Sequence, residues 1–512
     1  MRRPLVATAL AVVAALAVGT VGPASSPVGA TTVPRTPTGA QQALATVRSL
    51  LADDPTTARR SAGARPEATL AMRDLFLALP RLDAADRRTA HGLLARPTDG
   101  ASDPLDDGYT VPAHRTCEGH VCVHWVDRTA DAPPGRAWVN RTLRTMNAVW
   151  RHEVGELGYR EPRSDGRRGG NADLDVYLKE LGSRGIYGYC TPERRVTGYK
   201  WLASGYCVLD DDFARSQFGA PPRQSLRVTA AHEFFHAVQF GYDFAEDPWL
   251  LESTATWMEE RVADDVDDNR QYLPYGQVGT PGRSLDRFDQ QGFAQYGNWA
   301  FFEYLSSHFG PGVVKAIWTR AGAYRGAGHQ YSTNAVQGVL ARHGGFTGVY
   351  RAFAAANTTT SSSYPEGGGW PTAPVSAGWT LSRNTRSAHR SVTIDHLASR
   401  NVLVQPAGTL RDRRWRLRVA VDGPAGRTAP AAAVVSRTAS GLTRTAVPLD
   451  AEGRGSVLVG FGARQVSWAK VVLVNASTRF ACWHRTTWSC QGRARDDGRT
   501  FDLTVTAVPP RG

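Results

Sequence analysis

The chain has 512 residues, of which 42% are apolar and 21% are charged, and it contains 14 tryptophans. This composition excludes a disordered or fibrous protein, and the length predicts two or three domains. The formal charge of +13 comes almost entirely from arginines that are spread along the chain. Because the sequence has no basic stripe interleaved with aromatic residues, we expect no nucleic-acid partner.

The first thirty residues have the layout of a secretory signal peptide. Two arginines precede an apolar run over residues 5–21, and small residues follow up to Ala30. Such a segment is removed on export. Nothing later in the sequence resembles a transmembrane helix. We therefore expect residues 1–30 to be a signal peptide and the mature protein to be secreted, without a membrane partner. A retained N-terminal anchor is the alternative.

The six cysteines form three pairs that are close in sequence: Cys117 with Cys122, Cys190 with Cys207, and Cys482 with Cys490. Thiols of exported proteins are usually oxidised, so proximity predicts these three disulfides among the fifteen connectivities that six cysteines allow. His120 and His124 beside the first pair suggest a metal cluster as an alternative. The alternating apolar residues there predict a strand, however, on which the two histidines would lie ~13 Å apart. That separation is too large for two ligands of one zinc ion.

The coarse pattern along the chain predicts an α+β protein. Apolar residues at helical spacing over 41–51, 67–79 and 84–94 predict a helical segment within 31–104, either a removable pro-region or a structural cap. Residues 105–356 then form a mixed domain, with these elements expected in order: a strand over 121–126, a helix over 136–157, strands over 174–178 and 205–209, and mainly helices from 225 onward.

The last part of the chain has a different texture. Residues 357–386 contain low-complexity Thr/Ser and Gly runs, which are typical of a flexible linker. Residues 387–512 consist of short alternating runs separated by turn residues. This spacing predicts a β-rich, sandwich-like C-terminal domain, with strands at 392–394, 415–421, 457–461, 470–474 and 501–505.

The segment around residue 232 carries the clearest chemical pattern. His232 and His236 lie four residues apart in an apolar stretch, with Ser225 as the expected helix start and Gly241 as its expected end. On a helix, these histidines project from the same face and are close enough to share one metal ion. Glu233 is then placed to take a proton from the attacking water. The pattern predicts a zinc site with Glu233 as general base; a buried helix with two satisfied histidines is the alternative.

A carboxylate downstream completes the predicted site. Asp247 and the proline after it have the pattern of a helix start, and Glu252 follows in an apolar first turn. A carboxylate is costly to bury there without a partner, so we expect Glu252 to be the third ligand, which leaves one position for water. Glu259, seven residues on and on the same helix face, is a rival ligand or a partner of one, and Asp243 is a more distant option.

These motifs carry a resemblance to a known family. His232-Glu233-x-x-His236 followed by Glu252-x-x-Ala255 resembles the gluzincin branch of the zincin metallopeptidases. The runs 231–243 and 249–257, together with 172–177, are similar to a family of secreted bacterial metalloprotease-like proteins over residues 107–355. The resemblance implies a zincin-like domain at 105–356, zinc on the two histidines and Glu252, and protein or peptide substrates.

The sequence also departs from related patterns. Gln239 and Tyr242 stand where the metzincin pattern has a glycine and a third histidine, and the fifteen residues between His236 and Glu252 make a shorter gap than in well-known gluzincins. Tyr296, ahead of an amphipathic helix, is our candidate for stabilising a developing oxyanion, with a packing tyrosine as the alternative.

Two further expectations concern other ligands and a second function. The acidic runs 210–212 and 264–268 predict either Ca²⁺ sites or solvated turns, and neither follows an EF-hand pattern. The alternative to a peptidase is a catalytically inactive zincin-like protein that binds a cell surface through its basic β-rich tail.

Overall fold

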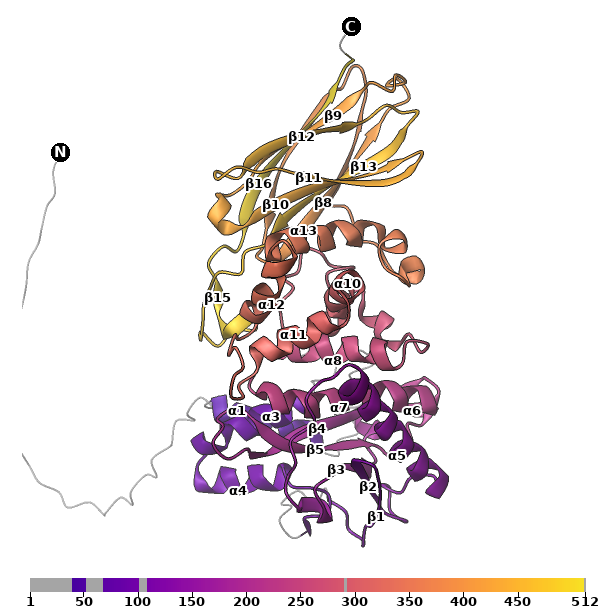
Figure 1. The fold of residues 1–512 in the computed structure, drawn as a ribbon, viewed down its shortest axis with the longest axis vertical. Coiled ribbons are helices and arrows are strands. Elements are labelled where there is room, and N and C mark those ends of the chain that lie inside the picture. Colours follow the sequence, from indigo (N-terminus) through magenta and orange to yellow (C-terminus); the bar gives the residue numbers. More distant parts are fainter. Residues whose placement is uncertain (1–38, 52–67, 101–107, 290–291, 511–512) are drawn as a thin grey trace, which may run out of the picture. The chain divides into compact units, whose positions relative to one another are not determined.

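The computed structural model describes residues 39–51, 68–100, 108–289 and 292–510, so the expected signal peptide lies outside the described residues. The described chain combines helices and sheets, which confirms the α+β class (Figure 1). No helix within these ranges is long and apolar enough to cross a membrane. The three predicted disulfides are all present: Cys117–Cys122, Cys190–Cys207 and Cys482–Cys490.

A five-stranded sheet with the order β1-β2-β3-β5-β4 forms the first part of the fold. Its strands are β1 (His114–Glu118), β2 (Val121–Trp125), β3 (Leu174–Lys179), β4 (Gly188–Arg195) and β5 (Ala203–Asp210). Strand β3 is parallel to both of its neighbours, and the two outer pairs are antiparallel. All residues of β2 and β3 are buried, as expected for strands that are covered on both faces.

Two long helices pack with this sheet. Helix α5 (Arg136–Trp150) continues as a π-helical turn over Arg151–Glu156. Helix α7 (Pro222–Asp243) begins at a proline three residues before the predicted Ser225 start and runs past Gly241. Proline is well suited to a first helical turn because it lacks an N–H. Gly241 does not end the helix: a side chain there would lie 3.3 Å from the carbonyl oxygen of Glu161, so close packing explains this glycine.

The N-terminal helices belong to the same compact unit as the sheet. They are α1 (Gly39–Leu51), α3 (Ala68–Ala78) and α4 (Ala84–Leu93), close to the predicted positions. Most of α3 is buried, and Nη1 of Arg73 donates a 2.9 Å hydrogen bond to the carbonyl oxygen of Glu246. Buried Arg96 pairs with Asp165, with Asp175 and with Glu193. The structure therefore describes these helices as a packed part of the fold.

The chain after α7 is mainly helical, as predicted. Its helices are α8 (Pro248–Val262), α9 (Ala294–Gly297), α10 (Trp299–Phe309), α11 (Gly312–Ala321), α12 (Thr333–Leu340) and α13 (Phe346–Ala356). The expected linker over 357–386 differs from a flexible connector. It contains 3₁₀ turns at Asn357–Ser362 and Gly367–Gly369 and the strand β6 (Ala377–Leu381). Residues 357–360 are buried because Tyr364 bonds to Asn357 and Lys470 bonds to the carbonyl of Thr358.

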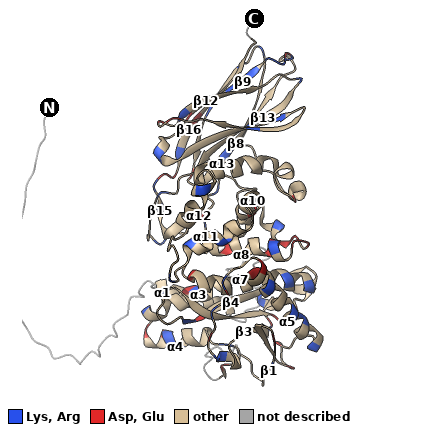
Figure 2. Cartoon of the chain, in the orientation of Figure 1, with Lys and Arg blue, Asp and Glu red and all other residues tan. Residues whose placement is uncertain are grey.

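The C-terminal part is a two-sheet sandwich, as predicted. One sheet has the order β11-β10-β13-β8-β6 and the other β12-β9-β16-β7. Besides β6, the strands are β7 (Ser387–Ile394), β8 (Ala398–Pro406), β9 (Arg416–Asp422), β10 (Pro430–Thr438), β11 (Gly441–Val447), β12 (Arg454–Gly460), β13 (Val466–Asn475) and β16 (Arg499–Val508). A separate hairpin pairs β14 (Phe480–Ala481) with β15 (Arg493–Ala494). Basic residues are scattered over helices and strands alike, as expected from the sequence (Figure 2).

Candidate metal centre

Helices α7 and α8 bring three buried side chains together. His232 and His236 lie one turn apart on α7, and Glu252 lies in the second turn of α8. Nε2 of His232 is 3.3 Å from Oε2 of Glu252, and Nε2 of His236 is 3.5 Å from Oε1 of the same carboxylate. One ligand atom of each residue lies within 4.8 Å of the others. The structure therefore places the three sequence-predicted ligands at one point.

The spacing of these atoms fits a zinc ion. Zinc holds His nitrogen and carboxylate oxygen at about 2.0–2.2 Å, so tetrahedral ligands lie about 3.4 Å from one another. The two measured nitrogen–oxygen distances, 3.3 and 3.5 Å, bracket that value. Nε2 of His236 is buried and forms no hydrogen bond within the described part of the chain. A cation between these atoms would satisfy both the nitrogen and the buried carboxylate charge.

The other ring nitrogen of each histidine is held by a side chain. Nδ1 of His232 lies 2.7 Å from Oε1 of Glu259, and Nδ1 of His236 lies 2.7 Å from Oε1 of Gln239. The amide of Gln239 in turn donates to the carbonyl of Leu251 at 2.9 Å. Such contacts orient a ligating imidazole and select the tautomer whose Nε2 lone pair faces the metal. Glu259 was expected as a rival ligand or as a partner of one, and Gln239 departs from the metzincin pattern. Each of them contacts a ring nitrogen of an expected ligand.

The electrostatics of the two histidines differ. Burial, together with the neighbouring His232, lowers the pKa of His236 well below its ordinary value, so His236 is neutral at pH 7. Burial also acts to lower the pKa of His232, but its hydrogen bonds with Glu252 and Glu259 outweigh burial and raise it well above the ordinary value. Without a metal, a proton on His232 balances these carboxylates. A divalent cation would replace that proton.

The structure separates the three candidates for the third ligand. Glu252 faces both Nε2 atoms, whereas Glu259 contacts the far side of the His232 ring. Asp243 lies at the end of α7, where Oδ1 accepts a 2.9 Å hydrogen bond from the amide of Ala245. Burial raises the pKa of Asp243 to about 7. The geometry therefore favours Glu252 as the ligand and leaves Asp243 outside the cluster.

Glu233, the predicted general base, is 4% exposed and is contacted from the N-terminal segment. The hydroxyl of Thr69 on α3 donates a 2.9 Å hydrogen bond to Oε2 of Glu233. The same hydroxyl accepts a 3.0 Å hydrogen bond from the amide of Cys190 on β4, which ends the sheet. Thr69 could not be predicted as part of the site, because no local motif links two residues that are 164 positions apart in the sequence.

Tyr296 also lies near the metal centre. Its ring centroid is 6.1 Å from that of His232, and Tyr272 packs against it with ring centroids 5.1 Å apart. Tyr296 thus lies next to His232, and its role as an oxyanion donor stays a prediction. The hydroxyl of Thr256, one turn after Glu252 on α8, donates to the carbonyl oxygen of Glu252 at 3.0 Å.

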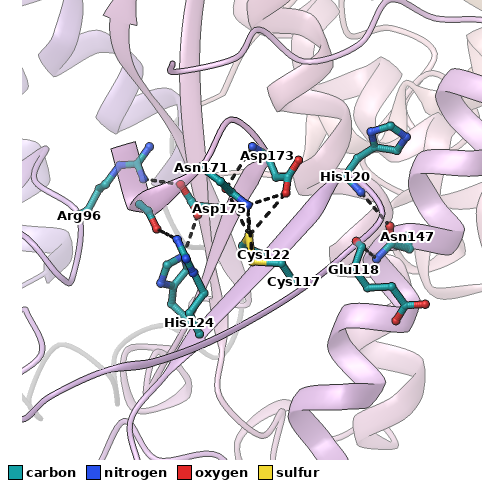
Figure 3. The surroundings of a disulfide bond; sticks show 12 residues. Arg96, Cys117, Glu118, His120, Cys122, His124, Asn147, Asn171, Asp173 and Asp175 are labelled. Carbon is teal, nitrogen blue, oxygen red and sulfur yellow. Dashed lines mark hydrogen bonds and ion pairs between the residues drawn. A yellow bond between two sulfur atoms is a disulfide. The ribbon is translucent and has the colours of Figure 1, made fainter. Parts of the chain in front are cut away.

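The two histidines near the first disulfide, His120 and His124, make separate contacts. His124 on β2 contacts Oδ1 of Asp175 at 2.7 Å, and Arg96 pairs with the other oxygen of that carboxylate (Figure 3). His120 stacks on Trp150, with ring centroids 4.6 Å apart. The sulfurs of Cys117 and Cys122 near Asp173 are joined in a disulfide, so they offer no thiolate to a metal.

The acidic runs are only partly gathered. Glu180, Asp210 and Asp211 lie close together, whereas Asp212 accepts a hydrogen bond from the amide of Ala214. The carboxylate of Asp210 already accepts hydrogen bonds from four backbone N–H groups. Burial raises the pKa of Asp210 to about 6 and that of Asp211 to about 8. Calcium binding at this cluster stays a prediction.

The second acidic run pairs with arginines instead. Asp265 forms a two-pronged contact with Arg227, and Asp267 pairs with Arg270. Only Asp264 of this run lies near two other carboxylates, those of Glu260 and Glu366.

No family model and no curated protein matches the chain. Among solved structures, it is similar to CorA, a surface-associated copper-binding protein important in copper acquisition by Methylomicrobium album BG8. The two are 12% identical, and the match covers 26% of this chain and 98% of that one with a TM-score of 0.16. A likeness at this level carries no argument about fold or function.

Proposed function

We propose that the protein is a secreted, zinc-dependent peptidase of zincin type, with His232, His236 and Glu252 as ligands. The observation that carries this proposal is the convergence of two imidazole Nε2 atoms on one buried carboxylate at tetrahedral spacing. The contacts of Glu259 and Gln239 on the remaining nitrogens support it further, because they present both lone pairs to the same point.

Residues of the chain would then have separate roles in peptide hydrolysis. A zinc ion held by His232, His236 and Glu252 would supply Lewis-acid chemistry, lowering the pKa of water and polarising a carbonyl group. Glu233, next to a ligand on the same helix, takes the proton from the attacking water and returns it to the leaving amine. Thr69 holds one oxygen of Glu233 in place. Tyr296 donates a hydrogen bond from its hydroxyl to the substrate oxygen that becomes negative.

The burial of the site bears on the substrate. His232 is 7% exposed and Glu233 is 4% exposed, so a folded protein surface cannot reach them. A flexible chain that threads into the site is the substrate that this geometry favours. The disulfides support an oxidising, extracellular location, where unfolded or partly degraded proteins would be cleaved.

The test is metal analysis beside an activity assay. Purified protein should hold about one zinc ion per chain, and His236→Ala should lose it. Glu233→Gln should keep zinc and lose hydrolysis of casein, a disordered substrate. A zinc-free wild type would contradict the metal site. A zinc-loaded wild type that leaves casein and short peptides intact would favour the surface-binding alternative.

A further inference from the structure

A second candidate site lies away from the metal centre. A pocket of ≈ 490 Å³ is lined by residues 279–284, Arg287, 374–376, Asp395, 400–401 and Trp488. None of the metal-centre residues lines it. Residues from the helical part and from the sandwich contribute to its walls, so the pocket forms where these two parts of the chain meet.

Three arginines give the pocket its charge. Arg283, Arg287 and Arg400 all line it, and Asp395 is the one acidic residue among the described residues that do so. None of the three arginine side chains forms an ion pair or a hydrogen bond within the described part of the chain. Nε of Arg287 is buried without a partner. Three guanidinium groups that share the pocket with one carboxylate leave an excess of positive charge, which an anion would balance.

The walls of the pocket are fixed by backbone hydrogen bonds. The amide of Ser399 donates to the carbonyl of Pro281 at 2.7 Å, and the amide of Leu285 donates to that of Leu397 at 2.9 Å. Arg400 lies directly over Gly282, where any side chain would overlap its guanidinium group. The arginines are thus presented by a preorganised frame, which reduces the entropy cost of binding a ligand.

Neutral groups extend the site beyond charge alone. Asn401 is buried, its amide donates to the carbonyl of Pro374 at 3.2 Å, and its Oδ1 has no hydrogen-bond partner in the described chain. That oxygen can accept a hydrogen bond from a hydroxyl group. Trp488 adds an aromatic wall, on which the apolar face of a ring can pack.

We propose that this pocket binds a phosphate or sulfate group, either free or carried on a sugar. Arginine pairs with such oxyanions through two parallel N–H···O bonds, and three guanidinium groups match their tetrahedral oxygens. The hydroxyl acceptor on Asn401 and the ring of Trp488 suit a sugar that carries the anion. The proposal does not depend on the peptidase assignment, since the two sites share no residue.

The test is calorimetric titration of the full-length protein at low ionic strength, with inorganic phosphate, inorganic sulfate and a sulfated heparin disaccharide as probes. Saturable binding at one site per chain is expected. Arg287→Gln and Arg400→Gln should each weaken it at least about tenfold, because each removes charge-assisted hydrogen bonds. Arg437→Gln, on an exposed position of β10, is the matched control and should bind like wild type. Chelator-treated protein should bind equally, which excludes an anion held by the metal centre.

Gly282→Ala keeps every charge and displaces only the guanidinium group of Arg400. It should weaken binding as Arg400→Gln does, with an unchanged circular dichroism spectrum. If the disaccharide binds more tightly than sulfate and Trp488→Ala removes that gain, the anion is carried on a sugar; equal affinities indicate the free ion. The proposal is overturned if none of the probes shows saturable binding, or if Arg437→Gln weakens binding as much as Arg400→Gln.

Discussion

The hydroxyl of Thr69 joins Oε2 of Glu233 to the amide of Cys190, with hydrogen bonds of 2.9 and 3.0 Å. A residue from the N-terminal helices thereby contacts both the expected general base and β4, the strand at one edge of the five-stranded sheet. Thr69 is fully buried, so the geometry of this bridge is set by packing on every side. The N-terminal segment therefore contributes to the site that the zincin-like motif defines.

Replacing Thr69 by valine tests this bridge. Valine keeps the shape and removes the hydroxyl, so the carboxylate of Glu233 loses a fixed donor and kcat for peptide hydrolysis should fall roughly tenfold. KM and zinc content should stay unchanged, because neither depends on this hydroxyl. Thr69→Ser is the matched control and should retain most of the activity. A faster Thr69→Val enzyme would instead show that the contact restrains the base.

The roles of the two glutamates on α8 can be separated by zinc affinity. Glu259→Gln keeps a group beside Nδ1 of His232 but changes its charge, and such changes typically cost about 10–100-fold in metal affinity. Glu252→Gln removes a direct ligand and should abolish stoichiometric zinc binding. Competition with a chromogenic chelator measures both. Stronger zinc loss in Glu259→Gln than in Glu252→Gln would reverse the assignment.

The cluster around Arg96 should control stability. Its guanidinium group pairs with Asp165, Asp175 and Glu193, and all four side chains are almost fully buried. Arg96→Met removes the cation shared by Asp165, Asp175 and Glu193, of which Glu193 keeps a second pair with Arg168. It should lower the free energy of unfolding by about 3–5 kcal/mol. Urea denaturation measures this loss. Arg168, with a side chain that is 44% exposed, pairs with Asp99 and with Glu193 of the same cluster and serves as the exposed comparison. Arg168→Met should cost less than about 1 kcal/mol, because Glu193 keeps Arg96.

The ion pairs of His396 should make the free energy of unfolding fall at alkaline pH. It lies between Asp286 and Asp497, with nitrogen–oxygen distances of 2.9 and 3.0 Å. Burial acts to lower its pKa, but the two carboxylates outweigh burial and raise it from 6.5 to about 10. Because the folded value is the higher one, the contribution of His396 is complete below pH 6.5 and is lost as pH rises through about 10.

This effect can be measured as the difference in unfolding free energy between wild type and His396→Gln across that range. The difference should shrink from pH 6.5 to pH 10. A difference that is constant with pH would mean that His396 stays neutral in the folded protein.

Local patterns in the sequence predicted much of the fold. The spacing of apolar residues was sufficient for α3, α5 and β2, and the Asp-Pro pair marked the start of α8 at Pro248. Strand β10 was missed because its Pro-Ala-Ala-Ala start does not alternate and both of its faces are covered. The expected linker was misjudged because its threonines are buried by contacts with distant residues such as Lys470.

In the candidate metal centre, too, some residues follow from local sequence patterns and others only from contacts between distant segments. His232, His236 and Glu233 follow from one motif on one helix, and Glu252 follows from the helix after it. The contact of Glu259 with a ring nitrogen of His232 and the hydrogen bond from Thr69 to Glu233 depend instead on long-range packing. No period or spacing in the sequence encodes such pairs, since each is set by how separate elements cross.

The C-terminal part of the chain contacts the start of the helix that carries Glu252. Its hairpin region places the amide of Cys490 2.6 Å from Oδ2 of Asp247, the residue that precedes α8. The side chain of Asp247 makes no capping bond to its own helix and instead accepts this one. Loss of activity on deleting residues 385–512 would therefore not distinguish a peptidase from a surface-binding protein, whereas Glu233→Gln does.

That contact also sets an order of events for the newly made chain. Asp247 and Cys490 are 243 residues apart, so this contact at the start of the helix that carries Glu252 forms only when almost the entire polypeptide has been synthesised. A truncated or clipped chain without residue 490 loses this hydrogen bond at the start of α8. The helix that carries Glu252 therefore gains this support only after the chain has been made as far as residue 490.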